Sequence, residues 1–188
     1  MAATAALLAI GLLLVSCDAA QYQCLDPLGC LEIPPGSPIV IGAILATNGE
    51  QGSVGMEALQ SVEQAVEDKD ELLGHPIQLM RYGTDCTADS ARAAATTFAT
   101  APDLLAVIGP TCTSETVAAN LILLNAGIPT LSPVPSSLAA YDLADQAFAA
   151  IERIAVQTPG KTLFIPRQAL LDAMHGSSQH PLFPASLR

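Results

Sequence analysis

Three short segments with hydroxyl, carboxylate or thiol side chains each follow an apolar run of the sequence. These segments are Asp85-Cys86, Thr111-Cys112-Thr113-Ser114 and Ser132-Pro133. In an open parallel sheet, ligands bind where the carboxyl ends of the strands meet helix N-termini. Thr113 and Ser114 lie at the predicted start of a helix, whose free N–H groups and dipole attract an anion such as a carboxylate. The same hydroxyls could instead only cap the helix, so a cap alone and a cap with a ligand are both open interpretations.

The elements around these segments follow a strand–helix alternation, which is typical of parallel β-α-β units. The predicted strands are 38–45, 77–82, 104–108 and 129–131, and the predicted helices are 56–73, 89–101 and 114–125, with a loop at 47–55. A long helical pattern then covers 138–156, followed by a β-like run at 161–165 and a last helix at 167–175. The predicted fold class is therefore α/β, a Rossmann-like parallel sheet flanked by helices.

Charge and motif content exclude several classes of function. The chain has 188 residues and a formal net charge of −11, so a polyanion such as nucleic acid would be repelled. The sequence lacks the G-x-G-x-x-G and G-K-[ST] motifs, and no Ser-His-Asp or Cys-His arrangement has supporting context. We therefore expect neither an enzyme nor a cofactor. His75 stands between a glycine and a proline, which predicts an exposed loop histidine rather than a catalytic one.

The N-terminal segment predicts export. An apolar run at 5–15 is too short to span a bilayer and leads into Leu14-Val15-Ser16-Cys17, which resembles the lipobox of bacterial lipoproteins. That resemblance implies a signal peptide at 1–16 and an acylated Cys17, followed by a proline-rich tether at 17–38. A plain secretory peptide with an incidental cysteine is the alternative, and no basic residue precedes Cys17. Both interpretations place the mature protein outside the cytoplasm, in the periplasm or anchored by lipid to the outer face of the cell membrane.

The chain has five cysteines, an odd number that suits an exported protein only if one of them is modified. If Cys17 carries lipid, four remain for two disulfides, and four cysteines allow three connectivities. Cys24 and Cys30 bracket a turn-forming segment, while Cys86 and Cys112 end neighbouring predicted strands, where their Cα atoms could lie within bridging range. A metal site is the alternative, but neither a C-x-x-C pair nor a histidine partner accompanies these residues, so we expect no metal.

Residues 38–133 resemble the N-terminal lobe of type I periplasmic binding proteins, in the leucine/isoleucine/valine-binding branch. The motifs that carry the resemblance are IVIGAI, LLGHPIQLMRYGTDC, LLAVIGPTCTSETVAA and GIPTLSP, in this order. Val54 departs from the pattern, because the amino-acid binders of the family often have an aromatic residue at this place. The fold implied is the one already predicted from the strand–helix alternation.

The resemblance also implies roles for individual residues. It implies a disulfide between Cys86 and Cys112, and a ligand carboxylate bound by the hydroxyl of Thr113. The ligand amine would be held by the backbone carbonyl of Val134 and the hydroxyl of Ser136. The candidate ligand-binding residues are therefore Thr113, Ser114, Val134 and Ser136.

Proteins of this family have two lobes, whereas this sequence resembles one. The segment 140–156 resembles the helix that follows the second lobe in the family and packs back on the first, which implies an internal deletion near 135–140. We therefore expect one lobe at 39–175, with the late helix covering one face of its sheet, and an irregular tail at 176–188. A cleft closed by two lobes is not expected.

These observations predict an extracytoplasmic substrate-binding lipoprotein of an ABC importer for branched-chain or related amino acids, reduced to one lobe. Its expected partners are an amino acid, the permease of the transporter and, through the lipid, the membrane. One alternative is a fragment of such a protein that does not take part in transport. Another alternative is the ligand-sensing module of a receptor.

We predict that Cys17 is acylated in the mature protein, because an apolar run and Leu14-Val15-Ser16 precede it. Mass spectrometry of the mature N-terminus is expected to find a lipid-modified cysteine as the first residue. The variant Cys17→Ser should lack this modification. A mature chain that begins at an unmodified Met1 in the cytoplasm would contradict the prediction.

Overall fold

The apolar segment IVIGAIL forms the central strand of a five-stranded sheet. The computed structural model describes residues 22–132 and 137–176, and in it this segment is β2 (Ile39–Leu45). All of its residues except Val40 are buried, as expected of a strand covered by helices on both faces. The other strands are β3 (Glu71–Leu72), β4 (His75–Gly83), β5 (Leu104–Ile108) and β6 (Thr130–Leu131), in the order β3-β4-β2-β5-β6. All are parallel except β3, which forms an antiparallel hairpin with β4.

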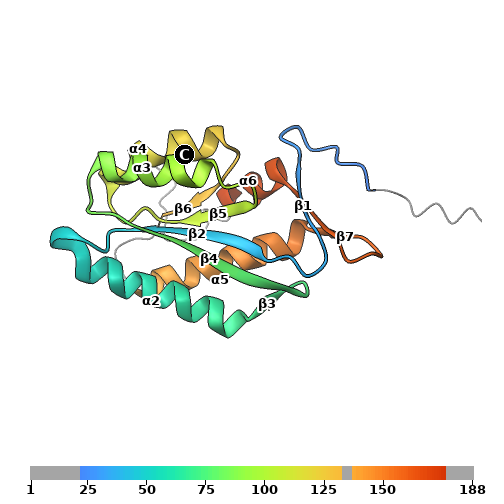
Figure 1. The fold of residues 1–188 in the computed structure, drawn as a ribbon, viewed down its shortest axis with the longest axis horizontal. Coiled ribbons are helices and arrows are strands. Elements are labelled where there is room, and N and C mark those ends of the chain that lie inside the picture. The colour runs from blue at the N-terminus through green and yellow to red at the C-terminus, as the bar shows by residue number, and fades with distance from the viewer. Residues whose placement is uncertain (1–21, 133–136, 177–188) are drawn as a thin grey trace, which may run out of the picture.

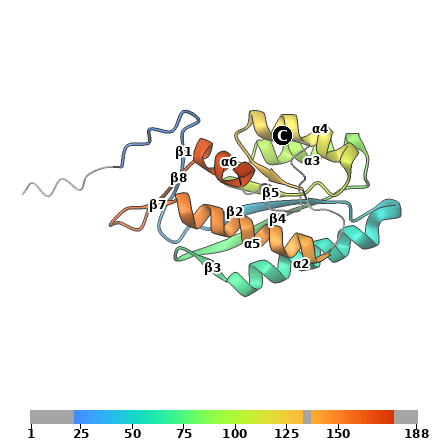
Figure 2. The same ribbon diagram turned by 180° about the vertical axis from the view of Figure 1, so that it is seen from behind.

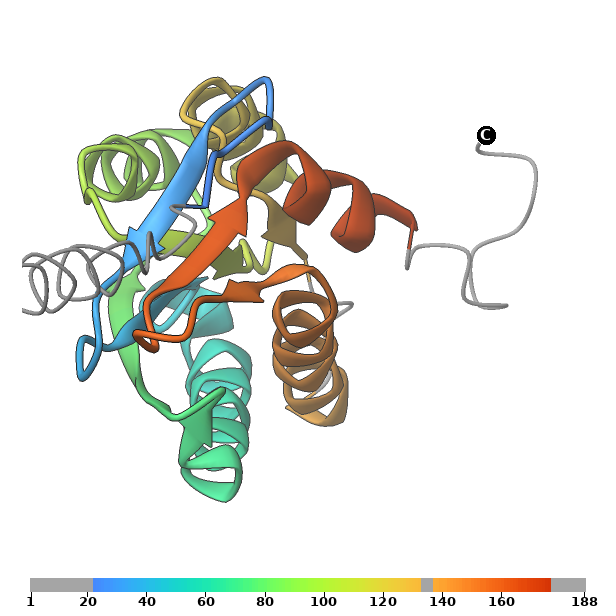
Figure 3. The ribbon, with the colours of Figure 1, turned by 90° about the vertical axis from the view of Figure 1, so that its right-hand side faces the viewer.

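Helices cover both faces of this sheet (Figures 1 and 3). On one face α3 (Ala88–Ala99) and α4 (Thr113–Asn125) pack side by side, and on the other lie α2 (Gly52–Lys69) and α5 (Ser137–Ile154). The ring of Phe98 lies directly over Gly42, where a Cβ atom would come within 2.6 Å of it. This arrangement confirms the predicted α/β class, a Rossmann-like parallel sheet flanked by helices.

One predicted helix was placed wrongly along the chain, whereas the other predicted elements end within two residues of those observed. The helix predicted at 56–73 is α2, which begins at Gly52 directly after the 3₁₀ turn η1 (Gly49–Gln51). The predicted loop 47–55 is thus partly helical, because Gly55 lets the first turns of α2 pass against the backbone of Ala46 without a clash. The helix ends at Lys69 because Asp70 adopts a positive φ of 57° and the chain then enters the β3–β4 hairpin.

The late helix α5 lies alongside α2 on the same face of the sheet (Figure 2). Its buried side belongs to the core shared with α2 and β2, to which it contributes Ala144, Phe148 and Ile151. At the surface, Glu152 forms an ion pair with Lys69 of α2 at 2.8 Å, which as an exposed pair adds little stability. This packing agrees with the expectation that the helix at 138–156 covers one face of the sheet.

A second, antiparallel sheet joins the two ends of the described chain. It has the order β1-β8-β7, with β1 (Cys30–Ile33), β8 (Leu163–Pro166) and β7 (Val156–Gln157). The segment 17–38, predicted as a tether without much regular structure, therefore contains a strand. Leu31 and Ile33 of β1 are buried because they pair with β8 near the other end of the sequence. Four residues between prolines have too little pattern to predict this strand without its partner.

His75 is buried, which makes the prediction of an exposed loop histidine wrong. It is the first residue of β4, and its side chain is only 1% exposed. Its Nδ1 lies 2.8 Å from the carbonyl oxygen of Ser37, and its Nε2 lies 3.3 Å from that of Lys161. The ring thus connects the start of β2 with the turn between β7 and β8. Because both partners are backbone carbonyls distant in sequence, nothing near His75 could have indicated this role.

Asp26 caps the last helix from the N-terminal side of the chain. It lies in the loop closed by the Cys24–Cys30 disulfide, and its carboxylate accepts N–H groups of Gln168 at 3.0 Å and Ala169 at 3.2 Å. These belong to the first turn of α6 (Arg167–Gly176), whose free N–H groups need such acceptors. Burial raises the pKa of Asp26, but backbone N–H donors, including that of Leu28, outweigh this and hold the pKa below its ordinary value.

We predict that Asp26→Ala lowers the free energy of unfolding by about 1 kcal/mol at pH 7, the usual effect of losing a helix cap. Because the pKa of Asp26 is lower in the folded than in the unfolded chain, its carboxylate stabilises the fold above about pH 4. This contribution is lost as the pH falls through the folded-state value.

Urea unfolding at pH 7 and pH 3 measures this difference between the variant and the original chain. The gap is expected to shrink at pH 3, whereas Asp103→Ala, at an exposed aspartate, should change little at either pH. A gap of the same size at both pH values would contradict the assigned role of the carboxylate.

Candidate ligand-binding site

The loops that follow β2, β4 and β5 are bonded to one another at the carboxyl edge of the sheet. The Ala46 N–H donates to Oγ1 of Thr111 at 3.2 Å, which links the end of β2 to the loop after β5. Thr84 lies just after β4, and its N–H donates to the carbonyl of Leu45 at 2.9 Å. The carbonyl of Thr84 accepts the N–H of Asn48, also at 2.9 Å. The segments identified from sequence at 85–86 and 111–114 are therefore neighbours in space. The prediction that their two strands are neighbours in the sheet was wrong, because β2 lies between β4 and β5.

A disulfide and a buried carboxylate hold two of these loops together. Cys86 and Cys112 are paired, with their Cα atoms 5.5 Å apart. Glu115, which is 0% exposed, accepts the N–H of Cys86 at 3.0 Å through Oε1 and that of Cys112 at 3.3 Å through Oε2. With the two sulfurs bonded to each other, neither is available as the thiolate that a metal would need.

Glu115 was not among the residues selected from the sequence, although a signal for it exists. It is the third residue of α4, and its carboxylate reaches back to the N–H of Cys112, the residue that precedes the helix. This is the spacing of a capping box, in which a glutamate usually follows a serine or threonine cap. A cysteine in the cap position hides the motif in the sequence.

The two candidate residues at the start of α4 differ in what they offer a ligand. Thr113 is the first residue of the helix, is exposed, and its hydroxyl has no hydrogen-bond partner among the described residues. The Ser114 hydroxyl donates to the carbonyl of Cys86 at 2.9 Å, so its proton already serves the contact between the two loops. Neither residue is the N-cap, because Cys112 occupies that position.

The remaining candidates cannot be placed in this site. Val134 and Ser136 lie outside the described residues, and so does the predicted acylation site Cys17. The structure therefore brings Thr113 and Ser114 together at one helix N-terminus beside the Cys86–Cys112 disulfide.

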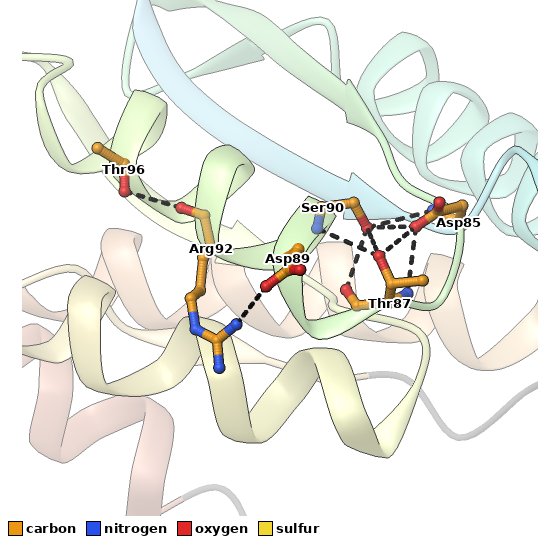
Figure 4. Close-up of polar contacts among 6 residues, drawn as sticks. All are labelled: Asp85, Thr87, Asp89, Ser90, Arg92 and Thr96. Atoms are coloured by element: carbon orange, nitrogen blue, oxygen red, sulfur yellow. Dashed lines mark hydrogen bonds and ion pairs between the residues drawn. The ribbon is translucent and has the colours of Figure 1, made fainter.

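Asp85 is held by the start of α3 (Figure 4). Its Oδ1 accepts the hydroxyl of Ser90 at 2.6 Å and that of Thr87 at 2.7 Å, while Thr87 in turn caps α3 by accepting the Ser90 N–H. These hydrogen bonds, that of Ser90 first, lower the pKa of Asp85. The side chain is exposed and stays a carboxylate at neutral pH, next to the disulfide.

An open hollow of about 590 Å³ lies between these groups. It is lined by Gly49, Glu50, Gln51, Asp85, Cys86 and Cys112. Glu50 and Asp85 are the two acidic residues of this lining, and α4 begins directly after Cys112. A helix N-terminus attracts negative charge and a carboxylate attracts positive charge, so this edge of the sheet suits a small ligand with both.

We predict that Glu115→Ala lowers the free energy of unfolding by about 1–3 kcal/mol, because it leaves the Cys86 and Cys112 N–H groups without their acceptor. Glu115→Gln should also destabilise, since only one of its two amide atoms can accept a hydrogen bond. Urea unfolding of the oxidised protein measures both variants. Glu67→Gln, at an exposed position of α2, is the matched control, and an equally small effect of Glu115→Gln would contradict the role of the carboxylate.

Comparisons with known proteins reveal similarity in fold. No protein-family model matches the sequence, and no curated protein is significantly similar to it. Among solved structures, one is the branched-chain amino acid transporter substrate-binding protein LivJ of Streptococcus pneumoniae, in complex with isoleucine (24% identity, TM-score 0.50). Another is a Rhodospirillum rubrum protein named as a candidate branched-chain amino acid ABC transporter (23% identity, TM-score 0.50). Each match covers 52% of this chain and 29% of the other. The chain thus has the fold of type I periplasmic binding proteins over about half of its own length, and it spans less than a third of the length of these two structures.

Proposed function

We propose that this chain is an extracytoplasmic substrate-binding protein of an ABC importer, and that it binds an amino acid at the carboxyl edge of its sheet. The observation that supports this most is the N-terminus of α4, which the disulfide and Glu115 hold beside an open hollow. The likeness to solved structures supports the fold on which this site is built.

The ligand's carboxylate would lie at the start of α4. There it can accept the hydroxyl of Thr113 and the N–H groups of Thr113 and Ser114, which precede the first N–H bonded within the turn, that of Thr116 to the carbonyl of Cys112. Its ammonium group would be held by the carbonyl of Val134 and the hydroxyl of Ser136, the roles implied by the family resemblance. Ser114 acts indirectly, by fixing the loop after β4 against α4. A branched-chain or related amino acid is the proposed ligand class.

Export and lipid anchoring complete the proposal. Two disulfides are characteristic of proteins in an oxidising compartment, which favours a location outside the cytoplasm. Among the described residues, no helix combines the length and apolarity needed to cross a bilayer. An acyl group on Cys17 would provide the membrane anchor, and the transporter's permease would receive the ligand.

Binding by this one surface is expected to be weak. A hydrogen bond to a ligand that stays exposed competes with water and contributes only about 0.5–1.5 kcal/mol. Contacts from Thr113, Val134 and Ser136 thus sum to roughly 1.5–4.5 kcal/mol, near or below the 4.1 kcal/mol of a millimolar complex. Binding proteins that bury their ligand between lobes satisfy its polar groups from both sides.

We predict that L-leucine binds the oxidised chain with a dissociation constant of about 1 mM or weaker. Thr113→Val should weaken binding by roughly two- to tenfold, the equivalent of one hydrogen bond. L-Leucinamide, which lacks the carboxylate, should not bind measurably. An NMR titration that follows backbone amide shifts at the start of α4 is suited to this affinity range.

Thr97→Val is the matched control, because the Thr97 hydroxyl donates to a carbonyl of its own helix, α3. Equal binding of leucine and leucinamide would contradict recognition of the carboxylate. A micromolar dissociation constant for leucine would contradict the one-sided site.

A further inference from the structure

The loop closed by the Cys24–Cys30 disulfide carries two leucines that face solvent. Leu25 is 89% exposed and Leu28 is 47% exposed, and Pro27 between them is exposed as well. Among the described residues, no other large apolar side chain is as exposed as that of Leu25. Single exposed apolar residues are common on proteins, so the position and surroundings of this loop decide what its leucines can do.

The loop presents these leucines from a fixed position and without charge. The N–H of Gly29 donates to the carbonyl of Asp26 at 2.9 Å, and the carbonyl of Gly29 accepts the N–H of Arg167 at 3.1 Å. Asp26 is the only charged residue of the loop, and its carboxylate accepts backbone N–H groups of Leu28 and of the first turn of α6. The tip of the loop is therefore apolar, on a chain with a net charge of −11.

The chain enters the fold beside this loop, close to the predicted acylation site. The ring of Tyr22 packs against that of Phe164 on β8, with the ring centroids 4.8 Å apart. Tyr22 is the fifth residue after Cys17, a stretch of at most about 18 Å when fully extended. Leu25 is the eighth, at most about 29 Å away. A lipid on Cys17 would thus hold the loop near the surface of the bilayer.

We propose that Leu25 and Leu28 insert into the interface of the membrane that carries the acyl group of Cys17. This proposal rests on the lipid anchoring described under the proposed function, and the short connection to Cys17 selects lipid as the occupant. One acyl chain anchors a protein only marginally, and a second apolar contact adds to it. The disulfide and Asp26 already order the loop, so its insertion fixes few further torsions.

Insertion of this loop leaves the candidate ligand site open. In Figure 1 the loop, in blue, lies at one end of the molecule, and the start of α2 lies at the other. The turn η1, which lines the hollow, directly precedes α2. The carboxyl edge of the sheet therefore faces away from the bilayer when the loop is inserted.

Tryptophan fluorescence tests the insertion, because the chain has no tryptophan of its own. The oxidised mature chain with Leu25→Trp is linked through Cys17 to a maleimide lipid in phosphatidylcholine vesicles. Cys17 can be labelled selectively, since the other four cysteines form disulfides. We expect lipids brominated on their acyl chains to reduce the emission at least about twofold, as for a side chain about 5–10 Å deep in the interface. Leu28→Trp should respond in the same direction.

Met56→Trp, linked to the same lipid, is the matched control. Met56 is 44% exposed in the first turns of α2, at the other end of the molecule, so brominated lipids should leave its emission unchanged. Leu25→Trp combined with Cys17→Ser reports on the loop without an anchor, and we expect little quenching. Because Leu25 and Met56 are exposed, circular dichroism should show that the variants fold.

Two outcomes would overturn the insertion. One is an emission of Leu25→Trp that brominated lipids reduce no more than that of Met56→Trp. The other is an emission of Leu25→Trp that shifts to shorter wavelength with rising protein concentration in the absence of vesicles, which would assign the loop to a second copy of the chain. An unmodified Cys17 in the exported protein would instead overturn the anchoring on which the proposal rests, so the two failures are distinguishable.

Discussion

The carboxylate of Glu115 holds together the two loops that form the edge of the sheet where the ligand is expected to bind. It is fully buried, and a buried carboxylate is costly unless hydrogen bonds replace its water. Here its two oxygens accept the N–H groups of Cys86 and Cys112, at the start of a helix whose dipole favours negative charge. The same two residues are joined by the disulfide. The start of α4 therefore has one position relative to the loop after β4, and the geometry of the hollow depends on it.

A disulfide and a carboxylate also act together at the start of α6. The disulfide Cys24–Cys30 closes a short loop, and Asp26 in that loop accepts backbone N–H groups at the start of α6. His75 joins the beginning of β2 to the turn before β8 through backbone carbonyls. Asp26 satisfies backbone N–H groups that the helix leaves unpaired, and the single N–H of a neutral His75 ring can satisfy one of its two carbonyl neighbours. Pairing such groups is less costly than burying them without a partner. The small antiparallel sheet is in this way attached to the large parallel one.

The helices differ in how they meet solvent, and this difference follows from their sequences. α2 and α5 each have an apolar side that packs on the sheet and a charged side that faces water. α4 has no such polarity, because leucines and a valine occupy both sides. Its N-terminus adjoins the candidate ligand site, while its outer side exposes Val117, Leu121 and Leu124.

The sequence by itself determined the succession of strands and helices along the chain and the position of Thr113 at a helix start, but not the order of the strands in the sheet, where β2 separates β4 from β5. These follow from local signals: apolar runs such as 104–108, helical spacing, and turn residues between them. It did not determine that β1 exists, that His75 is buried, or that Asp26 caps α6. The capping role of Glu115 has a sequence signal, its spacing from Cys112, but a cysteine is not the usual cap residue of that motif. Those facts depend on partners far along the chain, such as β8 for β1 and Lys161 for His75. Only tertiary structure decided them, because a hydrogen bond between distant segments leaves no periodic pattern in either one.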